Sequence, residues 1–123
     1  MENKKAVKLL NKLIKDLEEA NFITETAVDD LKALRPYAVE EKRPVIAKSF
    51  RLAYEHIEEN EVFVIPIPQD EPLEDETEVD DTNELITGAE SLIYLLNLIK
   101  NAHLDVNMEE IREYNRKFEA FAE

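Results

Sequence analysis

The feature that most constrains the fold of this chain is the helical spacing of its apolar residues, which recurs in four segments of ten or more residues. Over residues 3–20 the spacing is i, i+3, i+4, i+7, which places the apolar side chains on one side of a helix. The chain contains a single glycine and is rich in Leu, Glu, Lys and Ala, which lose little rotamer freedom in a helix. These properties predict an all-α protein.

A chain of 123 residues with 44% hydrophobic residues is large enough to build one core and too short for two. We therefore expect residues 1–123 to form a single helical domain, a bundle of four to five helices. Three parts are expected along the chain: N-terminal helices (1–60), an extended apolar arm with an acidic loop (61–82), and a C-terminal helical hairpin (83–123).

The N-terminal part contains two prolines that bear on where its helices begin and end. Pro36 disfavours helical geometry at Arg35, so the helix that follows residues 3–20 is expected to stop before Pro36. Pro44 lies inside a further apolar pattern that runs to Asn60, and two interpretations fit: one kinked helix, or a new helix that starts at Pro44. We favour the new helix, because proline costs little at the first helical position and about 3 kcal/mol in a helix interior. The residues expected to share the buried face of this pattern are Val39, Ile46, Phe50, Ala53 and Ile57.

The segment Val62–Pro68 is rich in β-branched residues and contains two prolines that would lack donors on the same edge of a strand. We expect an extended apolar arm that packs over its own bundle, since a long exposed apolar edge is an aggregation hazard. Residues 69–84 then hold nine acidic residues, no basic residue and only two large apolar ones, Leu73 and Val79. Such a composition cannot bury enough surface to offset the entropy of ordering, so this segment is predicted to be a mobile loop.

Two helices are expected after the acidic loop. The first, capped by Thr82 or Asn83 and running to about Ala102, is apolar on nearly all sides. It is expected at the centre of the bundle or partly in an interface between two copies, and this is the basis for predicting a homodimer. The last helix is expected to start with Asn107 as its cap. Its buried face is expected to hold Ile111, Tyr114, Phe118 and Phe121.

The net charge of −14 is concentrated in one stretch of the chain. No Lys or Arg occurs between Leu52 and Ile99, a stretch that holds 14 acidic residues, whereas the other 15 acidic residues are balanced by 15 Lys and Arg. A concentrated field of one sign selects partners electrostatically, so we expect this block to bind a basic protein partner. The candidate partner-binding residues in the block are Asp70, Glu71, Glu74, Asp75, Glu76, Glu78, Asp80 and Asp81.

One basic feature is identified in the sequence, on the side of the first helix opposite its apolar face. The lysines on this side are Lys4, Lys5, Lys8, Lys12 and Lys15. They can form a solvated helical face, or Lys4, Lys8 and Lys12 can bind the acidic loop of this chain or of a second subunit. Direct nucleic-acid binding is not expected, because the net charge opposes it and no aromatic residue lies among these lysines for base stacking.

The sequence contains no recognisable catalytic, cofactor or metal site. The absence of cysteine excludes thiolate nucleophiles and thiolate zinc sites. The two histidines, His56 and His103, lack the Glu-x-x-His spacing of di-iron bundles, and His56 with Glu59 supplies only two ligands. Selective calcium binding by residues 69–84 is not expected, because an EF-hand loop needs a glycine for its sharp turn.

We therefore expect a non-enzymatic protein-interaction or adaptor module that acts through helical surfaces and its acidic block. Two alternatives remain: an acidic mimic of nucleic acid that occupies a basic protein groove, and a divergent metal-dependent hydrolase. A cytoplasmic location is expected, because the N-terminus has no export signal and the longest apolar run, Leu85–Ile99, is too short to span a membrane.

Overall fold

The computed structural model describes residues 2–23, 25–67 and 88–122. These residues form five helices: α1 (Lys4–Ala20), α2 (Glu25–Glu40), α3 (Pro44–Asn60), α4 (Ala89–Lys100) and α5 (Asp105–Ala122). The described ranges contain no strand, so the predicted all-α bundle of four to five helices is confirmed. No helix in these ranges is long and apolar enough to cross a membrane.

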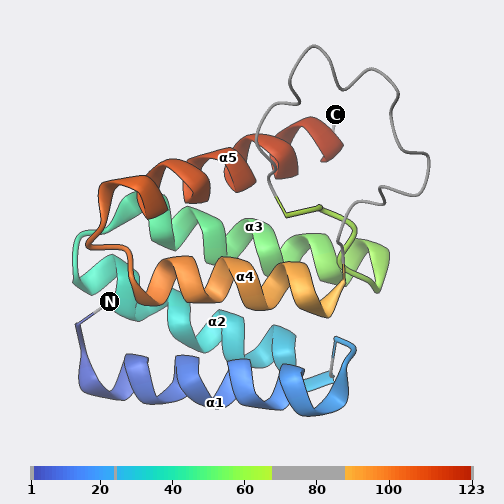
Figure 1. Ribbon diagram of the computed structural model, residues 1–123, viewed down its shortest axis with the longest axis horizontal. Helices are drawn as coiled ribbons and strands as arrows, with labels where there is room; N and C mark the ends of the chain where they lie inside the picture. The colour runs from blue at the N-terminus through green and yellow to red at the C-terminus, as the bar shows by residue number, and fades with distance from the viewer. Residues whose placement is uncertain (1, 24, 68–87, 123) are drawn as a thin grey trace, which may run out of the picture.

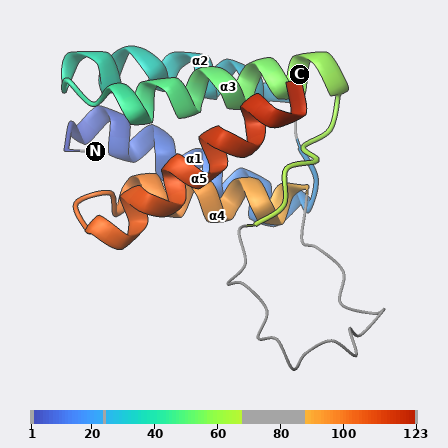
Figure 2. The ribbon, with the colours of Figure 1, turned by 90° about the horizontal axis from the view of Figure 1, so that it is seen from above.

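The five helices lie side by side with their axes along the long dimension of the molecule (Figure 1). Their main contacts form a closed ring in the order α1, α2, α3, α5, α4 and back to α1. Viewed from above, α5 runs obliquely across the bundle and packs against both α3 and α4 (Figure 2). The ring encloses a continuous apolar core to which all five helices and the segment after α3 contribute.

Helix α4 is buried by neighbours within the same chain. Its buried apolar residues are Ala89, Leu92, Leu95, Leu96, Leu98 and Ile99. Helix α4 forms one side of the five-helix ring, with α1 and α5 as its main neighbours, so it is not the central helix that its apolar residues predicted. The expected caps Thr82 and Asn83 lie outside the described residues. Because one chain already covers these residues, α4 no longer argues for a second copy, and the homodimer stays a prediction.

The expectation that the second helix stops before Pro36 is wrong, because α2 continues through Pro36 to Glu40. Proline removes one helical hydrogen bond, but the extra turn buries Ala38 completely and packs Tyr37 against the core. Helix α3 begins at Pro44, as predicted. Val39 is 54% exposed and so does not share the buried face of α3.

The segment between α3 and residue 67 packs on the bundle as an apolar arm. Phe63 and Ile65 are buried, whereas Val62 faces solvent. The N–H of Gly88 donates to the carbonyl of Phe63 (2.7 Å), and Ser91 Oγ donates to the carbonyl of Ile65 (2.7 Å). The arm is thus held by the start of α4. The predicted acidic loop, residues 69–84, lies outside the described residues.

The last helix differs from its prediction at both ends. It begins at Asp105 and not after Asn107, so Asn107 is not its cap. The side-chain amide of Asn107 instead donates to the carbonyl of Asn101 (3.0 Å) in the turn between α4 and α5. Ile111, Tyr114 and Phe118 are buried as expected, but Phe121 is 50% exposed because it lies in the last turn at the edge of the bundle.

Candidate functional site

The lysine face of α1 is exposed, and its best-connected member is already paired. Lys12 Nζ lies 3.2 Å from Asp16 and 3.1 Å from Asp30 of α2, and these hydrogen bonds raise the pKa of Lys12. Lys4 and Lys8 form no ion pair with a described residue. Among the described residues, the acid of another helix that pairs with this face is therefore Asp30 of α2. The eight acidic candidates between residues 70 and 81 lie outside the described residues.

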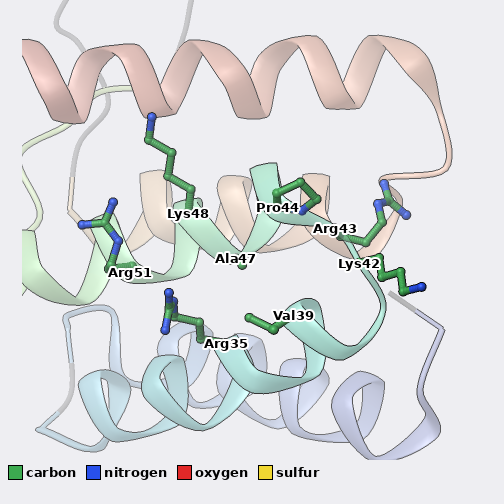
Figure 3. Close-up of a pocket in the computed structure, with 8 residues that line it drawn as sticks. All are labelled: Arg35, Val39, Lys42, Arg43, Pro44, Ala47, Lys48 and Arg51. Atoms are coloured by element: carbon green, nitrogen blue, oxygen red, sulfur yellow. The ribbon is translucent and has the colours of Figure 1, made fainter.

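A second basic surface lies between α2 and α3 and is the candidate functional site. We call it the α2–α3 groove; its volume is about 360 Å³. Its lining residues are Arg35, Val39, Lys42, Arg43, Pro44, Ala47, Lys48 and Arg51. Five of these residues are cations and none is acidic (Figure 3).

The groove results from the tight turn between α2 and α3. Lys42 adopts a left-handed conformation (φ 60°), and the N–H of Arg43 donates to the carbonyl of Ala38 (2.9 Å), so the chain reverses direction within a few residues. Arg35 and Arg51 consequently lie at one end of the groove, and Lys42 and Arg43 lie at the other (Figure 3). Val39 and Ala47 lie between these charged ends.

Three of the five cations have partners that hold them in place. Lys48 extends toward α5 and forms an ion pair with Glu119 (2.7 Å). Arg51 contacts Glu55 of its own helix (3.3 Å), and Arg43 Nη2 donates to the carbonyl of Ala102 (3.3 Å). These residues contribute positive potential to the groove, but part of their charge is compensated.

Arg35 and Lys42 have no such partners among the described residues. The Nε atom of Arg35 is buried and makes no hydrogen bond, and the exposed ammonium of Lys42 forms no ion pair there. A buried donor without an acceptor costs about 1–3 kcal/mol. Arg35 therefore has a guanidinium that forms no ion pair with a described residue and an Nε without an acceptor, which makes it the candidate group for binding an anion in the groove.

No expectation from the sequence included this surface, and the expectation that the lysine face of α1 is the one basic feature is wrong. Residues 31–54 contain six basic and two acidic residues, so a local charge count was the available signal. The expectation that a helix stops before Pro36 separates Arg35 from the residues that follow it, whereas α2 continues to Glu40. Only the turn that returns α3 along α2 places Arg35 beside Arg51.

His56, considered above as a metal ligand with Glu59, has a structural role. Its Nε2 accepts a hydrogen bond from the N–H of Val64 (3.0 Å), and its ring packs edge-on against Phe63, Phe118 and Phe121. This burial lowers the pKa of His56. The part of the chain that the structure describes holds no group of three or more side chains able to bind a metal ion.

Comparison with protein-family models, with curated proteins and with solved structures found no match for this chain. The α2–α3 groove and the distribution of charge along the chain are therefore the observations that bear on function.

Proposed function

We propose that this protein is a non-enzymatic interaction module that bridges two partners of opposite charge. The observation that carries the proposal is the separation of charge. Residues 31–54, which contain the α2–α3 groove, have six basic and two acidic residues, whereas no basic residue occurs from residue 52 to residue 99. In the proposed function the groove receives an acidic partner and the acidic block receives a basic one.

Electrostatics gives such a module a physical means of choosing partners. Complementary potentials steer encounter and raise association rates, and like charges exclude wrong partners. The effect is screened over about 8 Å at physiological ionic strength, so charges farther apart than this act nearly independently. Both interactions should therefore weaken as salt is added.

The test is affinity capture of partners from a native lysate at low salt with three variants of the chain. The first variant carries Arg35→Gln and Lys42→Gln, which removes the two unpaired charges of the groove. The second replaces the eight acidic candidates between residues 70 and 81 by their amides. The matched control is Lys15→Gln, an exposed lysine of α1 outside the groove.

We expect the two variants to lose different proteins and the control to lose none. A high-salt wash should release both sets, because both depend on charge. The proposal is overturned if the wild type and both variants capture the same proteins. It is also overturned if the purified chain turns over a substrate and loses that activity when chelator is added, which would favour the hydrolase.

A further inference from the structure

We propose that the α2–α3 groove binds a short acidic peptide of a partner protein in which an apolar residue lies between two carboxylates. This inference rests on the proposed function and specifies the acidic partner. It is built from three features of the groove: an unsatisfied arginine, a second unpaired cation, and an exposed apolar floor.

Arg35 provides the first contact. Its Nε is buried and lacks an acceptor, and its guanidinium extends from α2 toward α3 (Figure 3). The guanidinium is a planar fork that fits a carboxylate through two parallel hydrogen bonds. A movement of the Arg35 side chain toward the groove would let one carboxylate oxygen reach Nε, which no described residue satisfies. Lys48 and Arg51 add positive potential beside this contact without competing for the ligand, since each already has a carboxylate partner.

Lys42 provides the second contact, at the opposite end of the groove. It lies in the turn that follows the end of α2 at Glu40, whereas Arg35 lies inside that helix. An extended peptide advances about 3.3 Å per residue, so two acids with an apolar residue between them can be spread along the groove. Lys42 is exposed, so its ammonium acts as a point charge and tolerates variation in the peptide at this end.

The floor of the groove distinguishes a peptide from other anions. Val39 is 54% exposed and lies between the charged ends, with Ala47 opposite it and Pro44 beside them. An apolar side chain of the peptide would cover this surface, whereas an inorganic anion or a nucleic-acid backbone would leave it in water. The net charge of −14 also repels a polyanion more strongly than a peptide with two or three acids.

The α1 surface does not offer the same combination. A depression of about 300 Å³ there is lined by Lys5, Lys8, Leu9 and Lys12. All of its residues belong to one helix, and Lys12 already contacts two aspartates. No buried donor on this surface lacks an acceptor among the described residues.

The test uses a short fluorescein-labelled peptide with Glu-Leu-Ser-Glu at its centre and fluorescence anisotropy with the full chain at low salt. We expect saturable binding that weakens as salt is added. Arg35→Gln should lower the affinity about tenfold or more, because it removes a charged hydrogen-bond donor. Lys42→Gln should lower it about two- to threefold, since that contact is exposed. Lys15→Gln, with the same loss of charge on α1, should leave binding unchanged.

Two further changes, one in the chain and one in the peptide, separate specific recognition from an effect on folding and from non-specific electrostatic attraction. Arg35→Lys keeps the charge on a slightly shorter side chain but loses the planar fork, so it should bind nearly as weakly as Arg35→Gln while its urea unfolding curve stays close to that of the wild type. Replacing Leu by Ser in the peptide should weaken binding about fivefold, because Val39 then stays exposed.

Four results would overturn the inference: no binding of the peptide at low salt, equal binding by the wild type and by Arg35→Gln, equal binding of the Leu and Ser peptides, or tighter binding of a short single-stranded DNA. A fifth concerns the chain itself. If the variant with amides at the eight acidic candidates binds the peptide much more tightly, the natural occupant is this chain's own acidic segment. If the peptide experiment fails, the acidic-block variant should still lose its own partners in the lysate experiment. If the proposed function itself fails, neither the groove variant nor the acidic-block variant should lose a partner.

Discussion

Replacing Phe63 by alanine tests whether the arm after α3 is part of the core. Phe63 is 1% exposed, although it lies in a segment without helical structure. Its ring packs edge-on against the rings of His56 (centroid distance 5.5 Å) and Phe118 (5.6 Å). The side chain therefore joins α3 and α5 through the arm.

The expected loss can be estimated from this burial. Truncation of a fully buried phenylalanine to alanine costs about 3–5 kcal/mol, because the transfer free energy of the ring is lost and a cavity remains. A domain of this size has a free energy of unfolding of about 5–15 kcal/mol, so the variant should be far less stable than the wild type. The two aromatic contacts place the expected loss for Phe63→Ala at about 4–5 kcal/mol, the upper half of the range for such truncations.

Urea unfolding followed by far-ultraviolet circular dichroism measures this loss directly. The matched control is Val62→Ala, the neighbouring arm residue, which is 51% exposed and should lose less than about 0.5 kcal/mol. Phe63→Leu keeps most of the buried apolar surface and should lie between the two. A loss below about 1 kcal/mol for Phe63→Ala, or equal losses for Phe63→Ala and Val62→Ala, would refute the conclusion that the arm is packed.

Three further predictions concern other parts of the bundle. Burial lowers the pKa of His56, so the unfolded chain binds a proton at a higher pH than the folded chain does. Stability should therefore be complete above about pH 6.5 and fall as the pH drops toward the folded pKa. His56→Gln should reduce this dependence in urea titrations carried out above and below about pH 6.5. Pro36→Ala should stabilise α2 by about 1–2 kcal/mol by restoring a helical hydrogen bond, and a lower melting temperature would contradict this. Lys12→Gln should cost up to about 1 kcal/mol at low salt because Lys12 pairs with Asp30, whereas Lys8→Gln should cost nothing measurable, and 1 M salt should remove the difference.

Local sequence determined the helices whose apolar residues follow one uninterrupted spacing. Helix α1 begins after Asn3, whose side chain accepts hydrogen bonds from the N–H groups of Lys5 and Ala6, and its predicted apolar face is buried. The start of α3 at Pro44 also followed from a local rule, because proline fits the first helical turn wherever the rest of the chain lies. The packing of the arm was predictable from composition, since its apolar residues needed cover.

Tertiary structure decided the features that local rules could not. Pro36 lies inside α2 because burial of Ala38 against the core offsets the lost hydrogen bond, and that gain depends on neighbouring helices. His56 is an acceptor for the arm and not a metal ligand, because α3 and the arm meet around it. The α2–α3 groove likewise depends on a turn that brings Arg35 and Arg51, sixteen residues apart, to one end of one surface. Sequence by itself determined how many charges the chain carries and where they lie along it, whereas the path of the backbone decided which of them meet and which remain unpaired.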